Sequence, residues 1–287
     1  METNKYDSPA PVNSAKRLLS GASTLALLMS CGSAYAQDAI WSGSTSSDWF
    51  VASNWVSGIL PSSKVVRIGG ASGFAFSPVF GAGQSDSVFA LRIGGGNAGD
   101  TGAFTVEGGG RLSGVELHVG PESGTSGLMD VKDSGSNWTS IWQSDVNTGN
   151  SWIGYAAGST GELNISNGGS LDTHVLVLGH FGASGSFGRS AGIVRVEDPG
   201  SQLSAASIFI GNYGDGKLFV SQGGRVANQY TVIGAERGGT GRATVSGAGS
   251  QWTMTGDMNV GGYGSGELLI SDRGQVTTGS ITTIAAF

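Results

Sequence analysis

The residues that could do chemistry in this sequence are few and scattered. Histidine occurs only at His118, His174 and His180, and the single cysteine is Cys31. A zinc site without cysteine needs histidines and carboxylates that converge on one point. The three histidines fall in different sequence repeats at unmatched positions, so we interpret them as solvent-facing or turn residues and expect no metal site.

A glycan-cleaving site is the other chemistry to test. It needs two positioned carboxyl groups whose pKa values are separated. Asp145, near Trp142 in an inserted loop, is the best single candidate, and no second group pairs with it. The outward positions of the expected strands hold Asp130, Arg195 and Thr244 in one type of repeat, and Thr105, Asn164, Phe219 and Leu269 in the other. Neither set is a cluster of carboxylates, so we predict no catalytic residues and no enzyme.

Some glycine-rich stretches partly match the sequence motifs of calcium-binding and phosphate-binding loops. The calcium-roll motif G-G-x-G-x-D has a period of nine, whereas "GGYGSGE" from Gly261 lacks the Asp and "GNYGDGK" contains the single Asp215. The stretch "GGGNAGDTG" from Gly94 is not followed by the Lys-Ser/Thr of a phosphate loop. We therefore predict neither a calcium site nor a phosphate site, and no cofactor.

The composition indicates a turn-dense β structure. Glycine accounts for 52 of 287 residues, against about 7% in average proteins. Collagen is excluded because no Gly-X-Y register persists and only 6 residues are proline. Full disorder is disfavoured because 38% of the residues are apolar and only 13% are charged.

The first 36 residues have the features of an export signal. Lys16 and Arg17 precede the apolar run "LLSGASTLALLMS", and Ala34 and Ala36 form an A-x-A cleavage site. We predict cleavage after Ala36, with a lipoprotein site at Cys31 as the alternative. Cleavage after Ala36 would leave a chain without cysteine, hence without disulfides.

The balance of acidic and basic residues indicates which classes of partner the chain could bind. Without residues 1–36 the chain holds 12 basic and 19 acidic residues. This excess of acidic residues gives no indication of binding to nucleic acid or to an anionic membrane surface.

Three patterns recur in a fixed order along the rest of the chain. An apolar residue before glycine appears at Ile68, Ile93, Val119, Ile153, Leu178, Ile210, Ile233 and Val260. A Gly-x-apolar-x-apolar pattern starts at Gly102, Gly127, Gly161, Gly192, Gly216, Gly241 and Gly266. A third pattern alternates between "GGRL"-like turns and "GSNW"-like turns, so that the full repeat is a pair of turns.

A period near 25 residues with short strands predicts a parallel β-solenoid. Alternation within each strand places Leu163, Ile165, Leu218, Val220, Leu268 and Ile270 on the inner face. An antiparallel sandwich is the alternative, but its hairpins would recur every 8–12 residues. About eight coils at roughly 4.8 Å each would give a rod near 40 Å long.

The region from 37 to 64 differs from the repeats that follow it from 65 to 287. It contains Trp41, Trp49 and Trp55, together with Pro61. The end of a solenoid exposes an apolar core and an unpaired strand edge, so it needs a cap. We predict that the tryptophans form this N-terminal cap, with a carbohydrate-stacking aromatic patch as the alternative.

The pattern "WSG…DWFVASNW…LP" followed by repeated "IG…G.L.V..GG.V" resembles the passenger regions of bacterial autotransporters, the type V secretion proteins. The resemblance covers about residues 37–287. It implies a right-handed parallel β-helix that passes through the periplasm to the cell surface. It also implies a C-terminal translocator barrel, which is missing from this sequence, so we expect a fragment or another export route.

We therefore expect an exported, surface-displayed structural or adhesive segment with no catalytic, cofactor or metal residues. Its partner would be a host or cell-surface glycan or protein, and not a nucleic acid. A carbohydrate-active lyase or hydrolase is the alternative. The repeats stop part-way through a coil at "GSITTIAAF", so we also predict end-to-end self-association of this chain.

Overall fold

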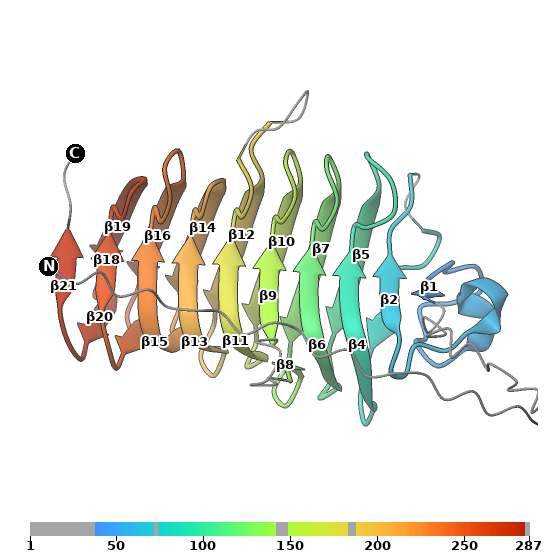
Figure 1. The fold of residues 1–287 in the computed structure, drawn as a ribbon. Helices are drawn as coiled ribbons and strands as arrows, with labels where there is room; N and C mark the ends of the chain where they lie inside the picture. The colour runs from blue at the N-terminus through green and yellow to red at the C-terminus, as the bar shows by residue number, and fades with distance from the viewer. Residues whose placement is uncertain (1–37, 72–73, 142–148, 183–187, 285–287) are drawn as a thin grey trace, which may run out of the picture. The chain divides into compact units, whose positions relative to one another are not determined.

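The chain folds as a parallel β-solenoid. The computed structural model describes residues 38–71, 74–141, 149–182 and 188–284. Their strands stack side by side with the same direction in successive coils (Figure 1), and they build about nine turns with almost no helix. The predicted fold class is thus confirmed, and no two named strands of the described residues form an antiparallel pair, as a sandwich would require.

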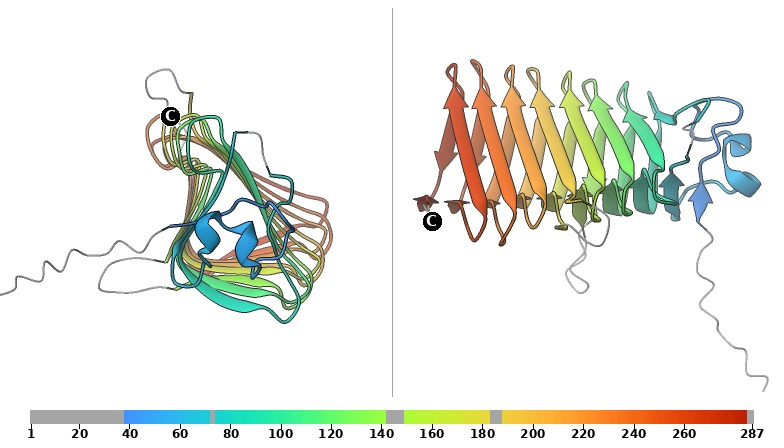
Figure 2. Two further views of the ribbon diagram at one scale, coloured as in Figure 1. Left: turned by 90° about the vertical axis from the view of Figure 1, so that its right-hand side faces the viewer. Right: turned by 90° about the horizontal axis from the view of Figure 1, so that it is seen from above.

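The strands form two sheets. The larger sheet contains β1 (Ala39–Ile40), β2 (Val65–Ile68), β4 (Ser85–Ile93), β6 (Arg111–Val119), β8 (Asn137–Ser140), β9 (Asn150–Ile153), β11 (Ser170–Leu178), β13 (Gln202–Ile210), β15 (Arg225–Ile233), β17 (Gln251–Met254), β18 (Met258–Val260), β20 (Gln275–Thr278) and β21 (Thr282–Ile284). The smaller sheet contains β3 (Val79–Phe80), β5 (Thr101–Val106), β7 (Ser126–Lys132), β10 (Thr160–Ser166), β12 (Ala191–Glu197), β14 (Asp215–Ser221), β16 (Thr240–Ser246) and β19 (Ser265–Ser271). Seen along the axis, the strands of successive coils superpose on shared faces (Figure 2).

The core consists of the repeated apolar columns. The eight apolar residues that precede glycine are all 0–4% exposed and stand in one register from β2 to β18. On the smaller sheet, Leu163, Ile165, Leu218 and Val220 point inward and are fully buried. Each column therefore stacks like on like between coils, which is how a strand of a few residues is stabilised in a solenoid.

Glycine is required where the two sheets approach each other. A Cβ atom at Gly192 would lie 2.0 Å from the carbonyl oxygen of Ile153, which belongs to the neighbouring coil. At Gly154 the backbone has φ +71°, and a Cβ would lie 2.1 Å from the carbonyl oxygen of Ala191. The two glycine patterns in the sequence thus come from contacts between backbones that leave no room for a side chain.

The alternating turns link the coils in pairs. In the "GSNW"-like turns a buried serine hydroxyl accepts a hydrogen bond from a glycine N–H in the "GG" turn of the preceding coil. The donor and acceptor pairs are Gly109 N to Ser136 Oγ at 2.9 Å, Gly168 N to Ser201 Oγ at 3.0 Å and Gly223 N to Ser250 Oγ at 3.0 Å. The two-turn repeat predicted from the sequence therefore has a structural basis.

Tryptophans cover the N-terminal end of the solenoid. Two short 3-10 helices, η1 (Ala52–Asn54) and η2 (Val56–Gly58), lie beside β1. Trp41, Trp49 and Trp55 are 0–2% exposed, and Trp55 meets each of the other two edge-on at 4.9 Å between ring centroids. Since their faces are not open to solvent, the alternative of a carbohydrate-stacking patch at these three tryptophans is wrong.

The last described coil is less buried than the coils before it. Ile270 is in register with the fully buried Val245, yet it is 48% exposed, and Leu268 is only partly buried. Both occupy inward positions, but no further coil covers them among the described residues. Their inward direction is as predicted, and their exposure shows that burial in a solenoid depends on the next coil.

Candidate functional site

The predicted outward positions on the smaller sheet lie in a single column. Asp130, Asn164, Arg195, Phe219 and their partners follow one another in register from β5 to β19. Asn164 donates to Asp130 at 3.0 Å, Arg195 pairs with Glu162, and the Arg195 guanidinium lies 5.6 Å from the ring of Phe219. The column is a surface ladder of polar contacts, and it brings no carboxylate pair together.

The glycine-rich stretches also have structural roles. Asp100 is buried, and its carboxylate accepts the N–H of Asn97 at 2.7 Å, so the turn contains its own anion and would repel a phosphate. Asp215 pairs with Arg189 at 3.0 Å. Within the described ranges no three histidine, cysteine or acidic side chains come together to hold a metal ion. Asp145, the candidate catalytic acid, and its neighbour Trp142 lie outside the described residues. The signal-region residues Cys31 and Ala36 do so as well.

Two of the histidines belong to one aromatic cluster. His118 is only 8% exposed, which contradicts its interpretation as a solvent-facing residue. It stacks on Trp152 with 4.5 Å between ring centroids, and Tyr155 stacks on His180 at 5.0 Å. Tyr155 also contacts His118 at 5.2 Å and Phe181 at 5.2 Å. We call these five residues the aromatic strip.

The register of the solenoid explains this assembly. Arg92, His118 and Trp152 each stand one residue before the buried apolar-glycine step, and they are paired across β4, β6 and β9. Tyr155 and His180 each stand one residue after that glycine, in adjacent coils joined by a hydrogen bond from His180 N to Gly154 O at 2.9 Å. The strip therefore crosses the coils along the axis.

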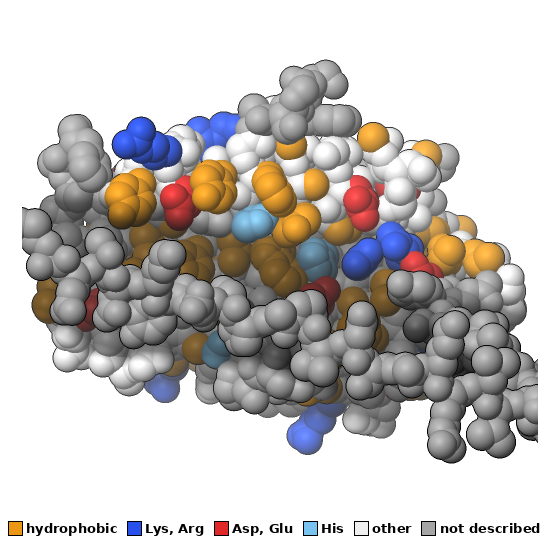
Figure 3. All heavy atoms as spheres, viewed as in Figure 1, with side chains coloured by type: hydrophobic (Ala, Val, Ile, Leu, Met, Phe, Trp, Pro, Cys, Tyr) orange, Lys and Arg blue, Asp and Glu red, His pale blue; other side chains and the backbone are white. Residues whose placement is uncertain are grey.

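The row of side chains extends beyond the strip. Phe181 is followed one coil later by Tyr213, whose N–H bonds to the carbonyl of His180 at 3.2 Å. Phe181, Tyr213 and the more distant Tyr263 are 44%, 45% and 72% exposed. In Figure 3, hydrophobic and histidine side chains gather along this face, with basic and acidic side chains near the end of the row.

A cavity of about 290 Å³ opens at the end of the strip nearest the N-terminus. It is lined by Arg92, Glu116, His118, Pro121, Glu122, Trp152 and Tyr155. These residues come from three consecutive coils: Arg92 from β4, the next four from β6 and its following turn, and the two aromatic residues from β9 and its turn. Of the hollows in the described residues, this one combines aromatic walls with several ionisable groups.

Polar groups in the cavity are only partly satisfied. The Nε2 atom of His118 lies 3.4 Å from Glu116 Oε2. The His118 Nδ1 atom and the Arg92 Nε atom are buried and have no hydrogen-bond partner. Buried polar atoms are normally paired with protein groups or with water, so the protein's own hydrogen bonding is incomplete beside this cavity.

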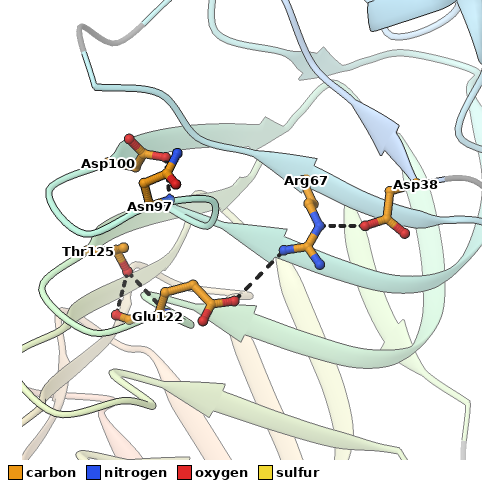
Figure 4. Close-up of polar contacts among 6 residues, drawn as sticks. All are labelled: Asp38, Arg67, Asn97, Asp100, Glu122 and Thr125. Carbon is orange, nitrogen blue, oxygen red and sulfur yellow. Dashed lines mark hydrogen bonds and ion pairs between the residues drawn. The ribbon is translucent and has the colours of Figure 1, made fainter.

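The charges around the cavity are balanced. The hydrogen bond from His118 and the nearby charges of His118 and Arg92 hold the pKa of the Glu116 carboxyl below its usual value, although burial opposes this. Glu122 lies 3.8 Å from Arg67, which also donates to Asp38 at 2.5 Å (Figure 4). Burial, and secondarily the charge of His118, lowers the pKa of His180. Each negative group near the cavity thus has a positive group close to it.

Two other hollows lie in the coils nearer the C-terminal end and carry less chemistry. A cavity of about 540 Å³ is lined mainly by glycines together with Arg189 and Tyr263. A second, of about 360 Å³, contains Lys217, Arg242 and Glu267 among its lining residues. Arg242 and Glu267 bind each other at 2.6 Å, so their charges are already neutralised. We therefore take the cavity beside the aromatic strip as the candidate site.

Sequence reasoning missed this site although a signal was present. The three histidines occupy unmatched positions in their repeats, so the signal lies in the different residue types that flank the apolar-glycine step. Aligning "LRIGG", "LHVGP" and "SWIGY" places Arg92, His118 and Trp152 in one column. Such an alignment would have put a charged, an imidazole and an indole side chain side by side.

Comparison with known proteins gives one distant relative. The chain is 27% identical over 181 residues to an "Uncharacterized lipoprotein YdeK" from Escherichia coli (strain K12). The match covers 59% of this chain but only 12% of the relative, so the chain spans about an eighth of that protein's length. No known family model matches the chain, and no solved structure matches it. Among the described residues no helix is long and apolar enough to span a membrane.

Proposed function

We propose that the chain is an exported, surface-displayed segment with a structural or adhesive function and no catalytic activity. The observation that carries this proposal is the aromatic strip, a row of side chains that runs along the outside of a stiff parallel solenoid. Aromatic side chains are enriched where proteins contact partners, and the row that continues the strip exposes Phe181, Tyr213 and Tyr263. The coil stack gives the strip a fixed spacing and a rigid support.

Export to the cell envelope has two supports. One is the signal-like N-terminus, with its basic residues, apolar run and A-x-A site. The other is the distant relative, which is named a lipoprotein, although this chain matches only 12% of its length. Beyond export to the cell envelope, we also propose display at the cell surface and an autotransporter-like export route.

The electrostatics of the cavity favour binding over catalysis. A general acid that works near neutral pH needs a carboxyl group whose pKa is raised. Glu116 has its pKa lowered by His118, so it stays ionised at neutral pH and has no proton to donate. The remaining carboxylate, Glu122, is 3.8 Å from the guanidinium of Arg67, a geometry suited to holding charge in place.

A second candidate function is a carbohydrate-active enzyme. The observation that favours it is that Glu116, His118 and Glu122 line the same cavity. Incubation of the purified chain with polysaccharides, followed by assays for new reducing ends and for unsaturated products, separates the two functions. Sustained product release that is lost in Glu116→Gln would favour the enzyme.

The test of the main proposal is display and adhesion in cells. The gene with its natural flanking sequence is expressed in a Gram-negative host, and external protease is added to intact cells. We expect cleavage of the solenoid in intact cells and increased attachment of those cells to glycan-coated or cell-coated surfaces. Protection of the chain until the outer membrane is permeabilised would contradict surface display.

A further inference from the structure

We propose that the cavity beside the aromatic strip is a binding site for one sugar ring of an uncharged glycan, whose chain continues along the strip. This inference rests on the proposed adhesive function and names its ligand class. The cavity lies where three coils meet, so its shape is fixed by backbone ladders on both sides. A preformed hollow with aromatic walls and a few polar groups is the usual form of a small-ligand site.

Hydrogen-bonding capacity points to hydroxyl groups as the ligand. The cavity is lined by the guanidinium group of Arg92, which donates hydrogen bonds, and by the carboxylates of Glu116 and Glu122, which accept them. A hydroxyl both donates and accepts, so adjacent hydroxyls on one ring can satisfy a cation and a carboxylate together. A ligand with acceptors alone, or with donors alone, would satisfy only half of these groups.

The charge balance indicates that the ligand is neutral. Arg92 stands among two carboxylates, and only Glu122 has a second cation, Arg67, close to it. An anionic sugar would meet Glu116 and Glu122 in a partly buried place, where like charges repel strongly. A cationic ligand would in turn meet Arg92. An uncharged polyol avoids both repulsions.

The aromatic groups suit a ring with apolar faces. Trp152 and Tyr155 line the cavity and are held by His118 and His180, which stack on them. Rings held in this way lose little conformational freedom when a ligand arrives. Beyond the cavity, Phe181 and Tyr213 are 44% and 45% exposed at equivalent places in successive coils, about 4.8 Å apart. An extended glycan could therefore contact a new side chain in each coil.

The test uses the purified exported chain and titration calorimetry. The probes are neutral hexasaccharides of glucose, galactose, mannose and N-acetylglucosamine, with hexagalacturonate as the anionic probe of equal length. We expect at least one neutral hexasaccharide to bind, with quenching of tryptophan fluorescence, and hexagalacturonate to bind much more weakly. Trp152→Ala and Arg92→Ala should each weaken binding by about tenfold or more.

Matched variants separate binding from folding. Phe219→Ala removes an outward aromatic ring from the other sheet, and Arg225→Ala removes an exposed arginine outside the cavity; neither should change the affinity. Arg92→Lys keeps the charge but loses the planar guanidinium, so it should also bind weakly while melting like the parent chain. Failure of all the neutral probes at millimolar concentration would overturn the inference, as would preferential binding of hexagalacturonate or equal affinity in the cavity variants.

The assay in solution does not depend on display. If the sugar binds but cells expressing the chain do not adhere, the site stands and the adhesive function fails. If cells adhere and no neutral probe binds, the site fails while the adhesive function stands.

Discussion

The hydroxyl of Ser201 accepts a hydrogen bond from the backbone N–H of Gly168, 33 residues earlier in the chain, at 3.0 Å. Ser201 is fully buried, and the same relationship joins Ser136 to Gly109 and Ser250 to Gly223. Each "GSNW"-like turn thus satisfies a backbone donor in the "GG" turn before it. One such hydrogen bond occurs in each pair of turns, which explains why the sequence repeats every two turns.

The first prediction removes that acceptor. Ser201→Ala leaves the Gly168 N–H without its partner, which should cost about 1–3 kcal/mol of unfolding free energy. Ser204→Ala, at a partly exposed serine of the strand β13 that follows Ser201, is the matched control and should change stability by less than about 0.5 kcal/mol. Urea unfolding followed by circular dichroism measures both. Equal midpoints for the two variants would show that the hydrogen bond does not stabilise the coil pair.

The second prediction concerns the contact between backbones at Gly192. Gly192→Ala places a Cβ 2.0 Å from the Ile153 carbonyl oxygen, so the coils must move apart, at a cost on the order of 3 kcal/mol or more. Gly188→Ala is the control, because its Cβ meets no atom within 4 Å. Thermal melting should show a large loss for the first variant and almost none for the second. A Gly192→Ala chain that melts like the parent would contradict the close approach.

The third prediction concerns the N-terminal cap. Trp49 is fully buried and contacts Trp55, Phe80 and Phe104. Trp49→Ala should therefore lower the unfolding free energy by about 3–5 kcal/mol and expose the first coil. Phe89→Ala, at a phenylalanine that is 53% exposed, should have little effect. Binding of a hydrophobic dye should rise in Trp49→Ala alone, and a lack of any difference between the two would argue against the cap.

The fourth prediction is a pH dependence that arises at His180. Burial lowers the pKa of this imidazole in the folded chain, whereas the unfolded chain titrates near ~6.5. Between those two values the unfolded state binds more protons, so stability is full above about pH 6.5 and falls as the pH drops toward the folded pKa. His180→Phe keeps an aromatic ring next to Tyr155 and removes the titration. The loss of melting temperature between neutral and mildly acidic pH should be smaller in this variant, and an unchanged loss would reject the assignment.

The sequence could predict the fold because the solenoid repeats its own constraints. Columns such as Ile153, Leu178 and Ile210 reveal the register, since each coil must present the same shape to the next. The site was not predictable in the same way, because Arg92, His118 and Trp152 differ in type from one coil to the next. Their meaning depends on the register, which must be known before they can be placed side by side.

The exposure of the last described coil has a related cause. Ile270 fits the inward pattern as well as Val245 does, but a pattern along one strand says nothing about what lies above it. A solenoid core residue is buried by the following coil as much as by its own. The pattern therefore predicts the direction of a side chain, and the neighbouring coil decides its exposure.

The last prediction follows from that uncovered coil. In the 287-residue polypeptide, Leu269, Ile281 and Ile284 are 47%, 67% and 76% exposed, and within the part of the chain that the structure describes β21 pairs only with β18. An unpaired strand edge with exposed apolar side chains favours pairing with another chain. We therefore expect concentration-dependent association in light scattering. Deleting residues 280–287 should not prevent this association, because the deletion exposes the coil beneath. An appended polar capping coil should prevent it.

The control is Phe89→Ala, which removes an exposed apolar side chain far from this end and should leave association unchanged. A monomer at high protein concentration would contradict the role of the open edge.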